Sequence, residues 1–357
     1  MSNKKIDMKR IGIVTITGSI VNYGNQLQNY AVQKVLQKME YNAETIYDVR
    51  WVKNPILLWS YWKSIIHLVT RYKYSPVKHK KSLRFFFWNR KYIKHSPIVI
   101  HSIDDEQKLL CIYDGFVVGS DQIWGPTYIS ELAFLDFAPK NLRVAYCPSF
   151  GISDLPNDKK AYYSKSLNTF SALSVRENQG REIIKDLIGR EASVLIDPTM
   201  MLDKQEWDKI AVSSPMKEFI LVYLLGESSI TYENYIYDIA KKNNLEIIDL
   251  TNHPKCSASN PSEFIGLIRE SQLVITDSFH GAVFSLLYHK DLVLLDRIGS
   301  FDMSSRMQTL WDKFQIKPQK IINGIYEVKN TNWCEFEYIL EEEREKAFLF
   351  LSTSIQI

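Results

Sequence analysis

Short apolar segments alternate along this chain with segments whose apolar residues recur at helical spacing. The first apolar segment, Ile11 to Thr17, is rich in β-branched residues, which is typical of a buried strand. Residues 26–39 then carry apolar residues near helical spacing, and residues 44–47 return to a strand-like pattern. Together the three segments predict a strand–helix–strand unit near the start of the chain.

The same alternation continues almost to the end of the chain. Further strands are expected at residues 116–118, 144–146, 172–175, 194–196, 220–225, 245–248, 273–276 and 292–295. Helices are expected at residues 177–188, 232–243, 262–270 and 282–289, and a final long helix at residues 335–351. Alternation at this spacing predicts an α/β fold with parallel sheets covered by helices.

A chain of 357 residues is long enough for two domains of ordinary size. We therefore expect two Rossmann-like domains that face each other across a cleft. The predicted N-terminal domain is residues 1–170, with an insertion at residues 51–95 that breaks the alternation. The predicted C-terminal domain is residues 171–330, followed by a C-terminal helix in residues 331–357.

Composition places few restrictions on function. Hydrophobic residues make up 45% of the chain and charged residues 24%, which is ordinary for a globular protein, and the net charge of +3 does not by itself indicate nucleic acid. Four widely spaced cysteines without a CxxC pair argue against a zinc site and are typical of a reducing compartment. No apolar run approaches the roughly 18 residues of a membrane span, and the N-terminus lacks a signal-peptide core. We therefore expect a cytoplasmic protein.

The segment at residues 51–95 differs in composition from the rest. It holds 11 Lys/Arg and no Asp or Glu, which leaves the remaining chain at about −8 (+3 minus 11), and 11 aromatic residues, among them Trp59, Trp62 and Trp88, lie among the cations. Contact with an anionic membrane surface and a self-packed lid over a cleft are both consistent with this composition. Nucleic-acid binding is a third interpretation, but nothing else in the chain supports it.

Ligands of open α/β sheets bind beyond the carboxyl ends of the strands, so residues directly after strands are the candidate site. After the first strand, Asn22, Gly24 and Asn25 surround a predicted helix N-terminus, where free N–H groups favour an anion or a sugar hydroxyl. A plain turn with an Asn cap is the alternative. The stretch is not GxGxxG, so a dinucleotide fingerprint is absent.

Four further strand ends carry chemistry-bearing residues. Asp121 is a candidate general base or ligand of a sugar hydroxyl, with a helix cap as the alternative, and Trp124 either stacks on a sugar or fills the domain interior. Arg176 follows a buried strand, where a guanidinium is costly unless it meets an anion, either a ligand or the adjacent Glu177. Asp197 precedes a proline and is interpreted mainly as a turn residue.

The fourth of these strand ends, Asp277 to Gly281, is the richest, because an acid, a hydroxyl, an aromatic ring, an imidazole and a glycine follow one buried strand. His280 would lie in the first turn of the next helix, where the helix dipole disfavours a charged imidazole. A neighbouring phosphate would restore that charge and make His280 a proton donor. A capping or packing histidine is the alternative.

These residues lie in an ordered set of motifs, NYGNQLQNYA, VVGSDQIW, SVRENQG, DPTM and TDSFHGAVFSLLYHK. The set resembles the polysaccharide pyruvyl transferase family over roughly residues 11–314. The resemblance implies a two-domain fold like that of the GT-B glycosyltransferases. It also implies phosphoenolpyruvate as donor, a sugar of a cell-surface glycan as acceptor, a pyruvate ketal as product, and no metal or redox cofactor. A lipid-linked form of that glycan would fit the membrane interpretation of residues 51–95.

The match departs from the family at one position. Well-studied members carry an arginine two residues before the matching histidine, and here that position is Ser278. Arg306, further along the chain, is the predicted replacement. We therefore predict that His280 and Asp121 are the catalytic residues. The predicted donor-binding residues lie in the C-terminal domain and are Arg176, Ser278, Phe279, Gly281 and Arg306. The predicted acceptor-binding residues lie in the N-terminal domain and are Asn22, Gly24, Asn25 and Trp124.

Two other functions remain open at this point. A glycosyltransferase of the same architecture would use a nucleotide sugar instead of phosphoenolpyruvate. A non-catalytic glycan-binding or membrane-binding protein would bind the acceptor without turning over a donor. For the pyruvyl transferase, a peripheral position at the inner face of the membrane is a further expectation.

Overall fold

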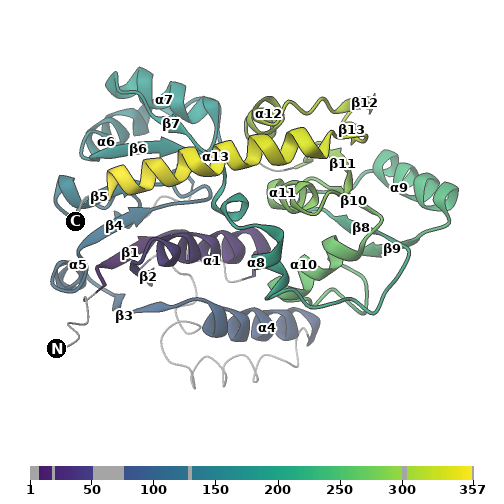
Figure 1. Cartoon of the computed structure of the whole chain (residues 1–357), viewed down its shortest axis with the longest axis horizontal. Coiled ribbons are helices and arrows are strands. Elements are labelled where there is room, and N and C mark those ends of the chain that lie inside the picture. Colours follow the sequence, from purple (N-terminus) through teal and green to yellow (C-terminus); the bar gives the residue numbers. More distant parts are fainter. Residues whose placement is uncertain (1–7, 18–20, 51–75, 128–130, 300–303, 356–357) are drawn as a thin grey trace.

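The computed structural model describes residues 8–17, 21–50, 76–127, 131–299 and 304–355. Within them the chain forms two α/β units, one built on a seven-stranded sheet and the other on a six-stranded sheet (Figure 1). The predicted α/β fold with two Rossmann-like sheets is confirmed.

The first sheet has the strand order β3-β2-β1-β4-β5-β6-β7, and every neighbouring pair is parallel. Its strands are β1 (Arg10–Val14), β2 (Asn42–Asp48), β3 (His95–Ile100), β4 (Gly115–Val118), β5 (Arg143–Ala145), β6 (Ala172–Val175) and β7 (Ser193–Val194). Central strands such as β4 are buried along their whole length, which explains their continuous apolar sequence.

The second sheet has the order β12-β13-β11-β10-β8-β9, parallel from β9 to β11 and antiparallel at β13 and β12. Its strands are β8 (Phe219–Tyr223), β9 (Glu246–Asp249), β10 (Leu273–Thr276), β11 (Asp291–Leu295), β12 (Gln319–Ile322) and β13 (Ile325–Val328). The chain proceeds from β8 to β9 on one side and returns to β10 on the other side of β8, so the strand order reverses between β8 and β10. The carboxyl ends of these two buried strands face the first unit.

Helices cover both faces of each sheet. They are α1 (Tyr23–Lys38), α4 (Pro76–Tyr92), α5 (Ile103–Leu110), α6 (Asn157–Leu167), α7 (Asn178–Ile188), α8 (Lys204–Asp208), α9 (Ile230–Asn243), α10 (Pro261–Glu270), α11 (Phe279–Leu287), α12 (Ser304–Lys313) and α13 (Trp333–Ser354). Short 3-10 helices lie at Glu131–Phe134, Lys140–Leu142 and Pro198–Met201. On the first sheet α1 lies on one face and α5, α6 and α7 on the other; on the second, α10 and α11 lie opposite α9.

One continuous apolar core joins the two units. Tyr23 of α1 stacks on Phe264 of α10 with ring centroids 4.6 Å apart, and its hydroxyl donates to the Ser259 carbonyl at 2.9 Å. Trp207 of α8 packs edge-on against Phe284 of α11 at 5.0 Å. The carboxyl ends of the two sheets are therefore held against each other by aromatic contacts.

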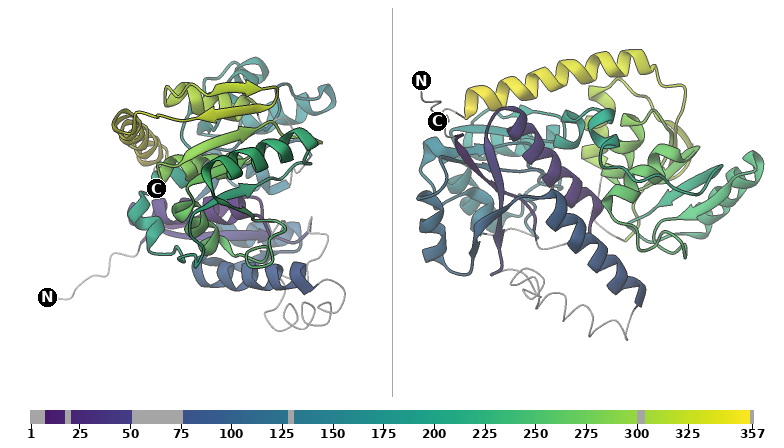
Figure 2. Two further views of the ribbon diagram at one scale, coloured as in Figure 1. Left: turned by 90° about the vertical axis from the view of Figure 1, so that its right-hand side faces the viewer. Right: turned by 60° about the horizontal axis from the view of Figure 1, so that its bottom comes forward.

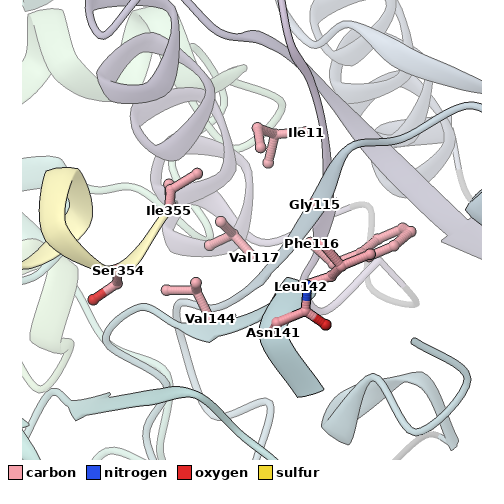
Figure 3. A pocket seen from close by; sticks show the side chains of 9 residues that line it. All are labelled: Ile11, Gly115, Phe116, Val117, Asn141, Leu142, Val144, Ser354 and Ile355. Atoms are coloured by element: carbon pink, nitrogen blue, oxygen red, sulfur yellow. The ribbon is translucent and has the colours of Figure 1, made fainter. Parts of the chain in front are cut away.

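Helix α13 runs across both units and ends on the first (Figure 1). The Ile355 carbonyl after it accepts a hydrogen bond from the Tyr41 hydroxyl at 3.3 Å. Beneath this end lies a small cavity at the amino ends of β1, β4 and β5, with room for about one water molecule (Figure 3). This is the edge opposite to the carboxyl ends where the site is predicted, and no ionisable side chain lines the cavity.

The predicted domain boundary between residues 170 and 171 is wrong. β6 pairs with β5 and β7 pairs with β6, so the first sheet continues to Val194. Arg176 and Asp197 follow these two strands, and both therefore belong to the first unit. A strand pattern identifies β6 and β7 as strands, but it does not say which sheet they join.

The predicted insertion at residues 51–95 is only partly described, because residues 51–75, with Trp59 and Trp62, lie outside the described residues. From residue 76 onward it is no insertion: α4 is the crossover between β2 and β3, and β3 pairs with β2. Trp88 of α4 is only 3% exposed and donates from Nε1 to the Ser262 hydroxyl at 2.8 Å. Its ring anchors α4 instead of facing a ligand.

Candidate functional site

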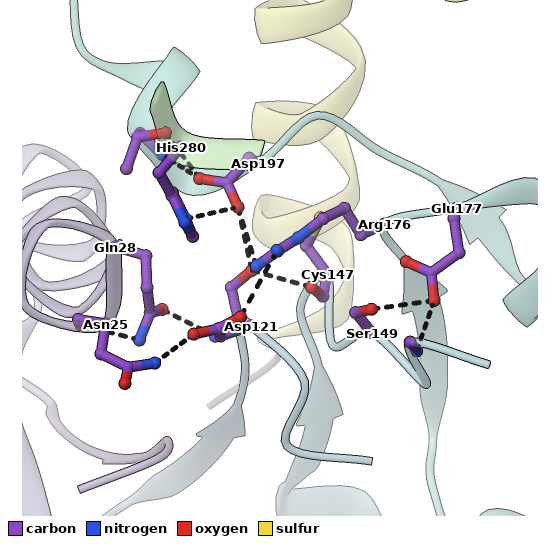
Figure 4. Close-up of polar contacts among 12 residues, drawn as sticks. Asn25, Gln28, Asp121, Cys147, Ser149, Arg176, Glu177, Asp197 and His280 are labelled. Atoms are coloured by element: carbon purple, nitrogen blue, oxygen red, sulfur yellow. Dashed lines mark hydrogen bonds and ion pairs between the residues drawn. The ribbon is translucent and has the colours of Figure 1, made fainter. Parts of the chain in front are cut away.

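The carboxyl ends of both sheets meet at a cluster of buried polar side chains (Figure 4). The first unit supplies residues after β1, β4, β5, β6 and β7, and the second supplies the turn between β10 and α11. This is the edge at which strand-end reasoning placed the site.

Arg176 is the centre of the cluster and is only 3% exposed. Its Nη2 atom lies 2.8 Å from Asp197 Oδ2 and donates to the Ser120 hydroxyl at 2.5 Å. Asp121 Oδ1 lies 3.6 Å from Nη1, and the guanidinium lies over the Phe279 ring, 5.0 Å from its centroid. Two carboxylates of the chain thus supply the anionic partners that burial of this arginine requires.

The pKa values of this pair move in opposite directions. Burial raises the pKa of Asp197, but the charges of Arg176 and His280 outweigh it and hold that pKa well below its usual range. Burial lowers the pKa of Arg176, but Asp197 and Asp121 outweigh it and raise that pKa above its usual value. Both groups are therefore charged at neutral pH.

His280 lies in the first turn of α11 and is 7% exposed. Its Nε2 atom lies 3.6 Å from Asp197 Oδ2, an ion-pair distance when the ring is protonated, and has no hydrogen-bond partner among the described residues. The other side of the ring packs on α1, where a Cβ added to Gly24 would lie 2.1 Å from Nδ1. Glycine at position 24 is therefore needed for the imidazole to lie there.

Asp121 faces α1 from the turn after β4. Its backbone has a φ of 61°, the left-handed region, which turns the carboxylate toward Asn25. The Asn25 side-chain amide donates to Asp121 Oδ2, while the Asn25 backbone N–H donates to the Asn22 side chain at 3.1 Å. Gln28 ties the same turn to α1 by accepting from the Ser120 N–H at 3.0 Å. Asn22 thus caps α1, and Asn25 orients the predicted base.

Arg306 of α12 reaches the same cluster, as the compensation hypothesis requires. It is 4% exposed, and burial lowers its pKa to about 10 although the Glu177 charge opposes the shift. Arg306 and Arg176, together with Lys313, line a small cavity that also contacts Asp197 and Phe279. Lys313 is a cation that the sequence reasoning missed.

Glu177 does not accept a hydrogen bond from Arg176. Its Oε1 atom accepts from the Ser149 hydroxyl and the Phe150 N–H, both at 2.9 Å, and from the Gly151 N–H at 3.3 Å. Glu177 therefore fixes the loop after β5. No sequence pattern indicates this role, because the loop that Glu177 holds lies some 27 residues earlier in the chain.

Trp124 is not placed to stack on a sugar, and that prediction is wrong. Its side chain is fully buried, donates from Nε1 to the Ala133 carbonyl at 2.8 Å and stacks on Phe134 with ring centroids 5.8 Å apart. No face of the indole is open to a ligand. Trp124 fills the interior of the first unit, the alternative that its sequence context had left open.

Ser278 and Gly281 shape the turn that presents His280. The Ser278 hydroxyl caps α11 by accepting from the Gly281 N–H at 3.3 Å, and a Cβ at Gly281 would lie 2.6 Å from the Thr276 hydroxyl. Asp277, unassigned from sequence, accepts from the Leu225 and Gly226 N–H groups, both at 2.7 Å. It therefore holds the loop after β8 against the turn that carries His280.

Nothing in the described part of the chain forms a group of three or more His, Cys, Asp or Glu side chains that could hold a metal ion. Within the same residues, no helix is both long and apolar enough to cross a membrane. The four cysteines are all unpaired.

Comparison with known proteins gives one family match. The family model described as "Polysaccharide pyruvyl transferase" matches residues 22–297, which contain every strand-end residue discussed above except Arg306. A comparison with curated protein sequences found no match.

Solved structures give distant matches. UDP-N-acetylglucosamine 2-epimerase from Rickettsia bellii is 8% identical, with 98% of this chain and 97% of that chain covered and a TM-score of 0.49. A putative UDP-N-acetylglucosamine 2-epimerase from Listeria monocytogenes is 10% identical, with 96% and 91% covered and a TM-score of 0.47. A heptosyltransferase from E. coli is 9% identical, with 82% and 91% covered and a TM-score of 0.37.

Proposed function

The chain belongs to the polysaccharide pyruvyl transferase family, and we propose that it transfers pyruvate from phosphoenolpyruvate to a sugar of a cell-surface polysaccharide precursor. The product is a ketal that bridges two sugar hydroxyls, and phosphate is released. The observation that carries the proposal is the position of His280, whose buried Nε2 faces Asp197 beside the Arg176 guanidinium.

The reaction sets clear requirements for the site. C3 of the enol gains a proton, C2 forms two new C–O bonds to the sugar, and the C2–O bond to phosphate breaks. Two hydroxyl protons are released, of which one balances the proton added to C3 and the other leaves with phosphate. The site therefore needs an acid near C3, a base near the hydroxyls and cations around the donor.

His280 is the proposed acid. A protonated imidazole at the start of a helix is opposed by the helix dipole, and the Asp197 carboxylate 3.6 Å away offsets that effect. Arg176 in turn keeps Asp197 ionised. Asp197 is thus a positioning residue, because it acts on His280 and not on the substrate.

Asp121 is the proposed base for an acceptor hydroxyl. The amide of Asn25 binds one carboxylate oxygen, while the other lies 3.6 Å from Arg176 Nη1. The proposed acceptor therefore approaches over the N-terminus of α1, between Asn22 and Asp121. This route supports the prediction that the N-terminal domain binds the acceptor.

The donor carries a charge of about −3 near neutral pH and needs several cationic or N–H partners. Arg176 is already balanced by two carboxylates, so further positive charge is required, and Arg306 lines the same cavity. This cavity has room for about one water molecule, whereas ligand pockets measure roughly 300–1,000 Å³. We therefore expect the two units to move apart when the donor enters.

The test is incubation of the protein with phosphoenolpyruvate and a panel of model and lipid-linked glycosides. Phosphate release together with a product heavier by one pyruvyl group is the expected result. His280→Gln should lower turnover by about 10²- to 10⁴-fold, the usual contribution of a general acid. His289→Gln is the matched control. His289 lies just beyond the C-terminal end of α11, away from the cluster, and pairs with Glu337 of α13.

Nucleotide sugars belong in the same donor panel. Consumption of a nucleotide sugar with no phosphate released from phosphoenolpyruvate would overturn the proposal in favour of glycosyl transfer. Acceptor binding without turnover of any donor would identify a non-catalytic glycan-binding protein. Full activity of His280→Gln would remove His280 from the mechanism.

A further inference from the structure

Helix α4 presents a basic face to solvent. Residues 76–94 contain seven cations and no Asp or Glu, and the cations are Lys78, Lys80, Lys81, Arg84, Arg90, Lys91 and Lys94. Lys80, Arg90 and Lys91 are exposed, and Phe87 between them is 45% exposed. Lys80, Phe87 and Lys91 are spaced by seven and four residues, so they share one side of the helix. We call Lys80, Phe87, Arg90 and Lys91 the α4 face.

The opposite side of α4 is fixed at the junction of the two units. Phe85 packs on Tyr23 of α1 with ring centroids 4.9 Å apart, and the Asn89 amide donates to Gln26 at 2.7 Å. Trp88 donates to Ser262 of α10 at 2.8 Å. Figure 2 shows α4 on the outer side of α1. The α4 face is therefore rigidly held and points away from both sheets.

We propose that the α4 face binds the surface of an anionic phospholipid bilayer. Clustered Lys and Arg are attracted to an anionic leaflet, and an aromatic side chain among them enters the boundary between headgroups and acyl chains. Charge complementarity selects this partner: every charged residue of the face is a cation, although the whole chain has a net charge of only +3. Phe87, 45% exposed among these cations, supplies the apolar contact that a helix face lying on a bilayer makes.

For α4, the described part of residues 51–95, the structure favours a bilayer over the two other interpretations. A nucleic acid would need a row of exposed rings for successive bases, and Phe87 is the one exposed aromatic among the described residues of α4. A lid would face the site, whereas the side of α4 that faces α1 and α10 is the buried one, with Phe85, Trp88 and Asn89. The outward cations have no part in closing the site.

Docking through α4 would hold the N-terminus of α1 at a fixed height above the bilayer. This part of the inference rests on the proposed function, and it identifies the acceptor as a lipid-linked glycan at the membrane surface. The binding itself does not depend on catalysis, so it can be measured without donor or acceptor.

The experiment is co-sedimentation of the full chain with vesicles of phosphatidylcholine, with and without phosphatidylglycerol. We expect binding only with phosphatidylglycerol, and weaker binding as salt shortens the screening length from about 10 Å at 0.1 M to about 3 Å at 1 M. The triple variant Lys80→Ala, Arg90→Ala, Lys91→Ala should bind at least about tenfold more weakly. Its matched control removes three exposed cations elsewhere: Lys241→Ala, Lys242→Ala, Lys320→Ala.

The remaining readouts separate the alternatives. Phe87→Ser should weaken vesicle binding without changing its salt dependence, because it removes apolar area and no charge. Equal loss in the α4 variant and its control, or equal binding to neutral vesicles, would overturn the proposal. Preference for single-stranded nucleic acid over acidic vesicles at the same salt would do so as well. Turnover of a soluble glycoside should be unchanged in the α4 variant, so failure of the proposed chemistry and failure of membrane docking give different results.

Discussion

Replacement of Asp197 by asparagine tests the electrostatic centre of the site most directly. Asparagine has nearly the same shape, and its carbonyl can still accept from the Thr199 N–H and hydroxyl, now at 2.9 and 2.6 Å. What disappears is the negative charge 2.8 Å from Arg176 Nη2 and 3.6 Å from His280 Nε2. The fold around residue 197 should therefore remain while the charge balance changes.

The expected loss of stability follows from the burial of the pair. Removing one partner of a buried ion pair costs about 3–5 kcal/mol, because the remaining charge stays buried without compensation. Asp121 remains 3.6 Å from Arg176 Nη1, so we expect the lower end, about 3 kcal/mol. The measurement is the midpoint of urea unfolding for the wild type and Asp197→Asn.

The stability difference should also depend on pH. The folded-state pKa of Asp197 is depressed, so its pairing contributes fully above the unfolded value of about 3.9 and is lost as pH falls toward the folded value. The difference in free energy of unfolding between the wild type and Asp197→Asn should therefore be constant near neutral pH. This difference should become smaller below about pH 4.

The catalytic consequence concerns the proton on His280. Unit charges 3.6 Å apart attract by about 4–5 kcal/mol at an effective dielectric constant of 20, and Asp197→Asn removes this attraction. We expect Asp197→Asn to lower turnover at neutral pH by at least about tenfold, because the carboxylate that faces the proposed acid is gone.

A matched aspartate serves as the control for this experiment. Asp203 also caps a helix through its carboxylate, accepting from the Glu206 N–H at 2.8 Å, but it lies outside the cluster. Asp203→Asn should cost about 1 kcal/mol or less and leave turnover unchanged. Wild-type turnover in Asp197→Asn, with the fold intact, would refute the role of Asp197 as a positioning residue for His280.

Two further substitutions test the donor cation and the approach of α1. Arg306→Ala should raise the KM for phosphoenolpyruvate by about tenfold or more, because a charged contact to the donor is lost. Arg306→Lys should recover part of the lost donor affinity. An unchanged KM in Arg306→Ala would contradict the idea that Arg306 replaces the arginine missing at Ser278. Gly24→Ala should lower turnover at least about 100-fold with an unchanged circular dichroism spectrum, since its Cβ would lie 2.1 Å from His280 Nδ1 and would displace the ring; wild-type activity would show that the imidazole position is not critical.

The strand-end rule predicted that Asp121, Arg176 and His280 lie close together, and the structure brings them into one cluster. Asp121, Arg176 and His280 each follow a short apolar run, and parallel strands bring such ends to one edge. The rule also placed Trp124 at the site, and it failed there because it says nothing of the direction in which a side chain points. The indole turns back into the core, where its N–H reaches the Ala133 carbonyl.

Asp197 shows what the sequence alone does not contain. The Asp-Pro pair after β7 predicts a turn, and Asp197 accepts a hydrogen bond from the Thr199 N–H as a turn residue would. Its second role depends on strand order, because β7 lies beside β6 and so brings Asp197 next to Arg176. The order in which strands pair is a tertiary property that a local sequence pattern does not show. The predicted boundary at residue 170 is wrong for the same reason, because β6 and β7 join the first sheet.

The division of the site between the two units explains why this electrostatic contact matters. Asp197, Asp121 and Arg176 belong to the first unit, and His280 belongs to the second. Within the first unit, the Asp197 and Asp121 carboxylates both lie near the Arg176 guanidinium. His280, at the N-terminus of α11 in the second unit, lies 3.6 Å from Asp197 Oδ2. The contact between the proposed acid and its carboxylate partner therefore forms only when the two units are together, and neither unit alone carries the proposed chemistry.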